Sequence, residues 1–221
     1  MDDRLPVRDE LFLLSHEESG KPLIHVPSLS AGLAGSLLID LALRGLIDGA
    51  HGRISAWQRE QAGDRPAPGL IGEGMEGQAV AEIRGTGGTR GAYDWIMTWH
   101  PGMYERVCAE MVTVGVLMPK TTRRLGLLPV TRHVPTQEAY VSRARGALRR
   151  TVTGVVAPDA GYAALCGLLY VLQLEGALHL STGGATLRKQ LFAIADRHTP
   201  TIREILSAVD KAVGELATSA F

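Results

Sequence analysis

The chain has 221 residues, 45% of them hydrophobic, which is long and apolar enough to bury the core of one large domain. Its 23 basic and 23 acidic residues cancel, so the composition excludes a protein that binds polyanions over its whole surface. Both cysteines, Cys108 and Cys166, lie in apolar helical patterns, and we expect buried thiols rather than a disulfide or a metal pair. The charged N-terminus lacks the apolar stretch of a signal peptide. We expect a single domain over residues 1–221.

A short helix and a long apolar helix come first along the chain. Residues 8–14 predict the short helix, and the segment from Pro27 to Arg44 predicts the long one. The leucines at helical spacing in this segment are Leu29, Leu33, Leu37 and Leu41. A helix that is apolar on nearly every side packs on every side, so we place it in the core. Its one charge before Arg44 is Asp40, which we expect to cap a neighbouring backbone or to pair with an arginine.

The middle of the chain alternates between glycine-rich breaks and short elements. After Ile47 the chain turns at Asp48-Gly49 or at His51-Gly52 and returns as a short strand through Ile54. Residues 59–75 and 85–91 are rich in glycine and predict loops on either side of a helix over 78–84. The next helix opens near Pro101 and ends at Gly115. The residues expected on its buried face are Met103, Val107, Met111 and Val114.

The C-terminal half predicts a β-hairpin followed by four helices. The hairpin occupies residues 116–130, and Thr136 is expected to cap a helix that runs to about Arg150. An apolar helix covers 159–174, and two amphipathic helices finish the chain. The apolar run over 160–174 is shorter than the about 20 residues that a membrane span needs. The fold class is therefore mostly α, a central helical bundle surrounded by amphipathic helices, with a protruding β-hairpin near 116–130.

The neutral total hides a local concentration of positive charge. Eight basic residues lie between positions 120 and 150, opposed only by Glu138: Lys120, Arg123, Arg124, Arg132, Arg143, Arg145, Arg149 and Arg150. Such a segment attracts phosphates or anionic lipid. Helical spacing, however, puts Arg143 and Arg150 on one stripe of their helix and Arg145 and Arg149 on another, which is also typical of an ordinary solvated surface.

The predicted hairpin tip combines charge with apolar side chains. Arg123 and Arg124 precede Leu125, Leu127 and Leu128. An apolar tip flanked by arginines suits an anchor at a membrane interface, and arginine can bind a phosphate through two parallel hydrogen bonds. We expect this tip to meet a membrane or a partner subunit. The leucines could instead cover the core.

Several segments together resemble the Golgi phosphoprotein 3 family. They are DELFLL at 9–14, GLAGSLLIDLALRGLI at 32–47, Gly115-Val116-Leu117, and His133 followed closely by Pro135. The resemblance covers most of the chain and implies a peripheral membrane adaptor that recognises phosphatidylinositol 4-phosphate. Arginine far outnumbers lysine, which fits a GC-rich bacterial genome, so we interpret the chain as a bacterial member.

The resemblance also implies where a lipid headgroup would bind. In the family an aromatic residue and three arginines hold it, and the matching positions here are His25, Ala34, Pro101 and Tyr104. None of these is arginine, so charge-assisted hydrogen bonds worth about 1.5–3 kcal/mol each are missing. A headgroup site in this chain is expected around His25, Tyr104 and Arg106.

No sequence motif favours an enzyme, a cofactor or a metal site. The chain lacks a Cys-x-x-Cys pair, a Gly-x-Ser-x-Gly elbow and a second histidine after His16-Glu17. Two alternatives to the lipid adaptor remain. One is a protein-binding or oligomeric scaffold that uses the hairpin, and the other is a winged-helix-like nucleic-acid binder. No predicted helix is uniformly basic, which argues against nucleic acid. The expected location is the cytoplasm, peripheral at the inner face of the membrane.

Overall fold

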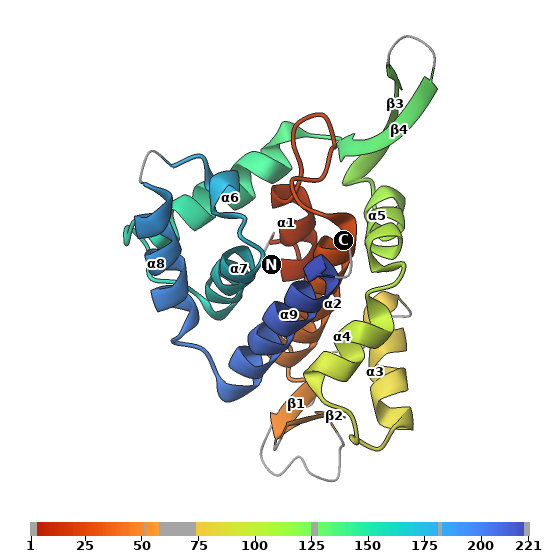
Figure 1. Cartoon of the computed structure of the whole chain (residues 1–221), viewed down its shortest axis with the longest axis vertical. Coiled ribbons are helices and arrows are strands. Elements are labelled where there is room, and N and C mark those ends of the chain that lie inside the picture. Colours follow the sequence, from red (N-terminus) through yellow and green to blue (C-terminus); the bar gives the residue numbers. More distant parts are fainter. Residues whose placement is uncertain (1–3, 51, 58–73, 125–127, 181–182, 219–221) are drawn as a thin grey trace.

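The computed structural model describes residues 4–50, 52–57, 74–124, 128–180 and 183–218, and gives only the backbone for 122–124 and 128. The described chain is mostly helical, with two small two-stranded ribbons, which confirms the predicted fold class. Along the longest axis of the molecule, the β3–β4 ribbon projects from one end and the β1–β2 ribbon lies at the other (Figure 1). The predicted hairpin therefore exists, and it protrudes from a helical body.

The elements follow one another in the order that the sequence patterns predict, with two additions, a helix over 92–99 and a 3-10 helix over 175–178. The helices are α1 (Val7–Leu14), α2 (Val26–Leu43), α3 (Met75–Gly85), α4 (Ala92–Trp99), α5 (Met103–Thr113), α6 (Glu138–Val152), α7 (Ala160–Val171), the 3-10 helix η2 (Glu175–Leu178), α8 (Gly184–Ala195) and α9 (Pro200–Thr218). The strands are β1 (Ile47–Ala50), β2 (Arg53–Ala56), β3 (Leu117–Arg124) and β4 (Leu128–Pro135). Both ribbons are antiparallel.

Helix α2 lies at the centre of the body, as its all-round apolar sequence predicts. Every residue from 28 to 41 is buried. Its glycines allow close packing, since a Cβ on Gly35 would lie 2.2 Å from Val209 Cγ2 of α9, and one on Gly32 would lie 2.7 Å from Leu172 just after α7. By length and composition α2 is the single described helix that could cross a membrane, but 78% of it is buried inside the protein.

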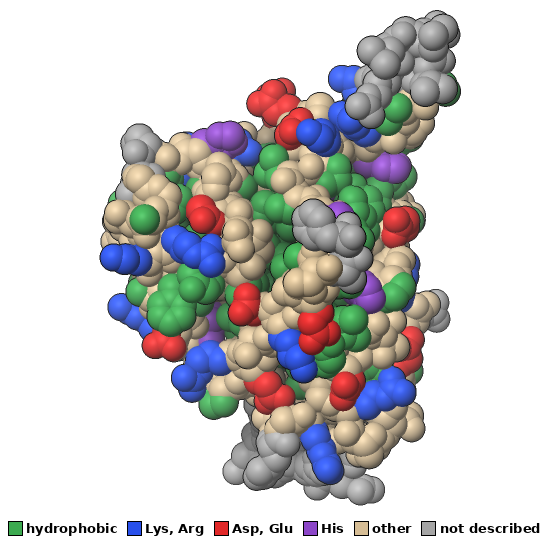
Figure 2. Space-filling view, in the orientation of Figure 1, with side chains coloured by type: hydrophobic (Ala, Val, Ile, Leu, Met, Phe, Trp, Pro, Cys, Tyr) green, Lys and Arg blue, Asp and Glu red, His purple; other side chains and the backbone are tan. Residues whose placement is uncertain are grey.

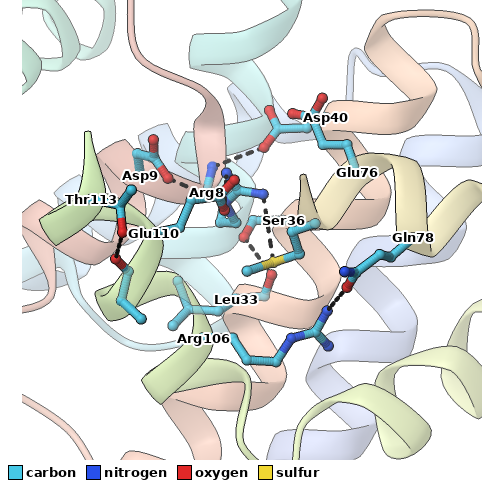
Figure 3. Close-up of polar contacts among 12 residues, drawn as sticks. Arg8, Asp9, Leu33, Ser36, Asp40, Glu76, Gln78, Arg106, Glu110 and Thr113 are labelled. Carbon is cyan, nitrogen blue, oxygen red and sulfur yellow. Dashed lines mark hydrogen bonds and ion pairs between the residues drawn. The ribbon is translucent and has the colours of Figure 1, made fainter. Parts of the chain in front are cut away.

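The carboxylate of Asp40 caps helix α1, which confirms the expected role of this residue. Its Oδ1 accepts the backbone N–H of Val7 at 2.9 Å. Its Oδ2 accepts the backbone N–H of Arg8 at 3.1 Å (Figure 3). The N-cap residue Pro6 has no side-chain acceptor, so Asp40 satisfies two N–H groups at the start of α1 that have no partner within the helix. The Arg8 guanidinium is buried beside it, paired with Asp9 and with Glu110 of α5.

The structure corrects the sequence predictions at four places. Helix α4 was not predicted. Val114 is not on the buried face of α5; it follows the helix and is 64% exposed. Thr136 does not cap α6, because its hydroxyl donates to the carbonyl oxygens of Gly115 and Val116. The hairpin continues to Pro135, which pairs with Leu117, rather than ending at residue 130.

Other expectations hold or fall outside the described residues. The first ribbon turns between Ala50 and Arg53, where Gly52 has a φ of +74°, whereas the alternative turn predicted at Asp48-Gly49 lies within β1. Asp159 caps α7 by accepting the N–H of Tyr162 at 2.7 Å. Most of the predicted 59–75 loop lies outside the described residues. So do Leu125 and Leu127, together with the side chains of Arg123, Arg124 and Leu128.

The buried Asp40 predicts a pH dependence of stability. Burial raises the pKa of Asp40 from 3.8 to about 6, although the two backbone N–H groups and Arg8 oppose this shift. As the pH rises, the unfolded chain therefore loses the proton of Asp40 at a lower pH than the native state does. The associated stability is fully present below pH 4 and is lost as the pH rises through about 6. Relative to Asp40→Asn, the wild type should lose up to about 3 kcal/mol between pH 4 and pH 7, measured by urea denaturation.

The matched control for this prediction is Asp210→Asn on the exposed side of α9. Its difference in unfolding free energy from the wild type should not change over the same pH range. Parallel pH curves for the wild type and Asp40→Asn would contradict the proposed titration of Asp40.

Candidate functional site

The strongest candidate for a functional surface is the β3–β4 hairpin, whose base is fixed to the helical body. Eight residue pairs join the strands, from Leu117 with Pro135 to Arg124 with Leu128. The 15–22 turn packs against β4 near the base: Gly20 has a φ of +73°, and a Cβ there would lie 2.5 Å from the carbonyl oxygen of His133. Arg132 adds a hydrogen bond to the hydroxyl of Ser19 at 3.2 Å. These contacts hold the base of the hairpin in one orientation.

A cavity of about 310 Å³ lies at the base of the hairpin, between β3, β4, α6 and the end of α1. Its apolar wall includes Phe12, Leu13, Leu117, Val134 and Val141, and its polar rim includes Glu17, Glu18, Lys120, His133, Glu138 and Arg145. Basic and acidic side chains lie next to one another at the base of the hairpin (Figure 2). The cavity itself therefore has no single sign of charge.

His16 links this cavity to the expected headgroup position Tyr104. Its Nδ1 lies 2.6 Å from the carbonyl oxygen of Phe12, and its Nε2 lies 2.9 Å from the hydroxyl of Tyr104. Burial lowers the pKa of His16 to about 4, helped by nearby His133 and opposed by the Phe12 carbonyl, so the ring is neutral at pH 7. Because a carbonyl can only accept, Nδ1 carries the hydrogen and Nε2 accepts the Tyr104 hydroxyl proton. No local sequence pattern indicates this pair, since the residues are 88 positions apart.

The three residues expected around a lipid headgroup have different surroundings. His25 is exposed at the N-cap of α2. Tyr104 faces the end of α1, whereas Arg106 donates to Gln78 of α3 at 3.2 Å (Figure 3). The structure thus does not bring Tyr104 and Arg106 together. Ala34, which takes the place of a family arginine, is wholly buried.

The arginines of α6 divide into two groups, along the two stripes that helical spacing predicts. Arg145 and Arg149 turn toward η2: Arg145 donates to Ala177 O, and Arg149 donates to Leu178 O and His179 O. Arg143 instead lines a smaller cavity with Tyr162, and Arg150 lies close enough to Tyr162 to affect its pKa. Two of the α6 arginines therefore serve the fold.

Of the eight basic residues between 120 and 150, the two others with described side chains are Lys120 and Arg132, and both lie on the hairpin. Lys120 is exposed, and Arg132 is half-buried. Together with Arg123 and Arg124 of the same hairpin in the sequence, they concentrate positive charge on the part of the molecule that projects furthest (Figure 1).

The geometry gives little support to catalysis or to nucleic-acid binding as the function. Within the described ranges, no group of three or more His, Cys, Asp and Glu side chains could hold a metal ion. Burial raises the pKa of Cys108 to about 11 and that of Cys166 to about 12, which makes both thiols poor nucleophiles. Helix α2 is buried along most of its length, so it is not available to enter a DNA groove as the winged-helix alternative would require.

The burial of Ala34 yields a prediction about the family's headgroup position. Ala34→Arg should not rebuild a headgroup site, because an unpaired guanidinium in the core costs several kcal/mol. We expect a loss of about 4 kcal/mol or more, seen as a fall in Tm of about 10 °C or more by circular dichroism. Ala109→Arg, on the exposed side of α5, is the matched control and should melt within a few degrees of the wild type. A stable, folded Ala34→Arg protein would show that this position can open to the surface.

Comparison with known proteins agrees with the fold and the hairpin. The model of the Golgi phosphoprotein 3 (GPP34) family matches residues 7–216, nearly the whole described chain. Among curated proteins, none matches the chain at a significant level. The family match begins at α1 and ends within α9, so it spans the central helix and the hairpin alike. The chain therefore belongs to the Golgi phosphoprotein 3 family.

Proposed function

We propose that this protein is a non-enzymatic peripheral membrane adaptor that docks its β3–β4 hairpin on an anionic lipid surface. One observation carries the proposal: a hairpin with four cationic residues and no acidic ones projects from the helical body of a chain whose total charge is zero. Each Lys or Arg held near an anionic bilayer contributes about 1 kcal/mol of attraction. Since the rest of the chain has an excess of acidic residues, the attraction is concentrated on the hairpin, and the molecule approaches the membrane with that end first.

The proposed lipid selectivity is for negative charge rather than for one headgroup. Family membership favours phosphatidylinositol 4-phosphate as a ligand. Two features of this chain argue for a broader selectivity: Ala34 is buried in the core, and the Tyr104 hydroxyl is already bonded to His16. A phosphate monoester at this position would need arginines that the chain lacks. We therefore propose that phosphatidylserine and phosphatidylinositol 4-phosphate bind in proportion to their charge, at the inner face of a membrane.

Flotation with liposomes tests the docking proposal. Wild-type protein should float with vesicles that contain about a third phosphatidylserine and should remain at the bottom with phosphatidylcholine alone. Raising the salt from 0.1 M to 0.5 M should weaken binding, because salt screens attraction between exposed charges. The combined variant Arg123→Glu, Arg124→Glu and Leu127→Asp should lose at least about tenfold in partitioning, since it reverses two cationic contacts and makes the tip polar.

A control with the same change in charge can be built on exposed positions away from the hairpin. Lys189→Glu, Ala193→Asp and Arg203→Glu alter α8 and α9 in the same way. This control should float like the wild type. Equal losses in both variants would mean that total charge, and not the hairpin, determines binding. A saturable preference for phosphatidylinositol 4-phosphate, beyond its extra charge, would contradict the broad selectivity.

A specific feature of the hairpin favours a second candidate function, a scaffold that assembles through it. Among the described strands, β3 and β4 pair only with each other, so the outer edge of each ribbon strand has no partner strand. Exposed strand edges are templates for pairing with another chain. A second copy could add its hairpin edge to edge, which would unite two molecules with two hairpins on one side.

Light scattering after size exclusion tests the assembly proposal. At about 50 µM we expect the wild type to elute as a species larger than a monomer, because edge pairing extends the ribbon. Replacing residues 122–129 with a short glycine-containing turn should give a monomer of unchanged helical content by circular dichroism. Monomers for both proteins would exclude the hairpin as an interface, while leaving membrane docking open.

A further inference from the structure

The two faces of the β3–β4 hairpin differ in chemistry, and the strand register sorts the residues between them. Residues directly opposite each other in an antiparallel pair project from the same face. Lys120 is opposite Arg132, so both cationic side chains project from one face of the ribbon, the cationic face. The neighbouring pair, Thr121 with Thr131, projects from the other face, the threonine face.

The threonine face satisfies its own polar groups. The hydroxyl oxygens of Thr121 and Thr131 are 3.1 Å apart and form a hydrogen bond across the strands. Two exposed prolines, Pro119 and Pro129, lie on the same face by the alternation of the strands. By the same register His133, opposite Pro119, and Arg123, opposite Pro129, also belong to this face. The threonine face is open to solvent at both threonines and differs from the cationic face in having no two cationic residues directly opposite each other.

The cationic face is electrostatically incomplete. Cβ atoms of directly opposite residues are about 5 Å apart, and like charges at this spacing destabilise the pair. Arg132 has a neutral partner, the Ser19 hydroxyl, and within the described residues no ion pair joins Lys120 or Arg132 to a carboxylate. Met118, 47% exposed, lies on the same face two residues nearer the base. Lys120 shares the cavity at the hairpin base with Glu17, Glu18 and Glu138 but forms no described ion pair with them. Two opposite cations without an ion pair, beside apolar surface, are suited to an anionic group on an amphipathic ligand.

The position of this pair along the hairpin fits the depth of a lipid headgroup layer. Strands rise about 3.3 Å per residue, so Lys120 lies about 10 Å from Leu117 at the base, and β3 continues for about 13 Å beyond it. Interfacial segments enter a bilayer by about 5–10 Å. With phosphates at the level of Lys120 and Arg132, the outer part of the hairpin is long enough to reach the acyl boundary.

The base of the hairpin limits further entry. Glu17, Glu18 and Glu138 line the cavity there, beside Lys120 and Arg145. Glu17 pairs with Lys21, and Glu18 interacts with Arg145. These carboxylates would be repelled by an anionic surface, so the base of the hairpin is less suited than its outer part to contact with the membrane.

From this geometry we infer that Lys120 and Arg132 form a phosphate clamp: the cationic face of the hairpin holds the phosphate of an anionic phospholipid between the two side chains, and the threonine face does not take part. This inference deepens the proposed membrane docking and rests on it. It assigns the ligand, a lipid phosphate, to a site on the hairpin that contains none of the residues at the family's headgroup position.

The experiment compares four proteins by flotation with phosphatidylserine vesicles. They are the wild type, Lys120→Gln with Arg132→Gln, the matched control Thr121→Gln with Thr131→Gln, and a swap variant that combines Lys120→Gln, Arg132→Gln, Thr121→Lys and Thr131→Lys. The first double variant should bind about thirtyfold more weakly, as the loss of two cationic contacts predicts. The threonine control should bind within about threefold of the wild type. The swap variant keeps the total charge but moves it to the threonine face, and it should stay at least about tenfold weaker.

Hydrogen exchange of the β3 and β4 amides, without vesicles, separates binding from folding. Lys120→Gln with Arg132→Gln should exchange no faster than the wild type, because it removes a repulsive pair. Recovery of full binding by the swap variant would overturn the clamp while leaving membrane docking intact, since binding would then follow charge alone. Failure of the wild type itself to float with phosphatidylserine would overturn the docking proposal, and the clamp with it.

Discussion

The structure depends on the burial of one helix on all its sides. Helix α2 packs against α9, α4, α5, α7 and α1, and it can do so because Gly32 and Gly35 let neighbouring side chains approach where any larger residue would collide. The one buried carboxylate of α2, that of Asp40, caps the start of α1 and so joins the two helices. The hairpin joins this body through the close approach of Gly20 to His133 and through the hydrogen bonds of Thr136 to Gly115 and Val116.

Features that local sequence determines were predictable, and features that depend on distant partners were not. The period of the leucines in α2, the isolated Asp40 and the charge-rich hairpin are all visible within short windows. Helix α4 is short and follows a glycine-rich break, so its periodicity was too brief to recognise. Thr136 has the composition of a cap but donates to carbonyls 20 and 21 residues earlier, and no local pattern can show such a contact. The same holds for the His16–Tyr104 bond and for the arginines that bind η2.

The family's headgroup position bears on the proposed role of the charge on the hairpin. Where the family resemblance places an arginine inside the central helix, Ala34 contributes to the core, and Tyr104 contributes to a neutral network with His16. Both substitutions exchange a charged group for packing, which strengthens the body and removes a reason for a phosphate to bind there. Cationic residues remain on the ribbon, where Lys120 is exposed and Arg132 is half-buried and bonded to Ser19. Recognition by charge density, with little selectivity for headgroup stereochemistry, is the expected consequence.

The modest size of the hairpin links the two proposed roles. Four cationic residues at about 1 kcal/mol each give about 4 kcal/mol, which corresponds to a dissociation constant of about 1 mM. In the proposed docking a single hairpin would bind weakly and reversibly, and the rest of the chain, with 19 basic and 23 acidic residues, would add no attraction. Two hairpins held side by side convert the second docking event into an intramolecular one, and affinity then rises by orders of magnitude without any new contact. On this argument edge pairing and lipid binding are not competing functions of the ribbon, because assembly supplies the avidity that a lone hairpin lacks.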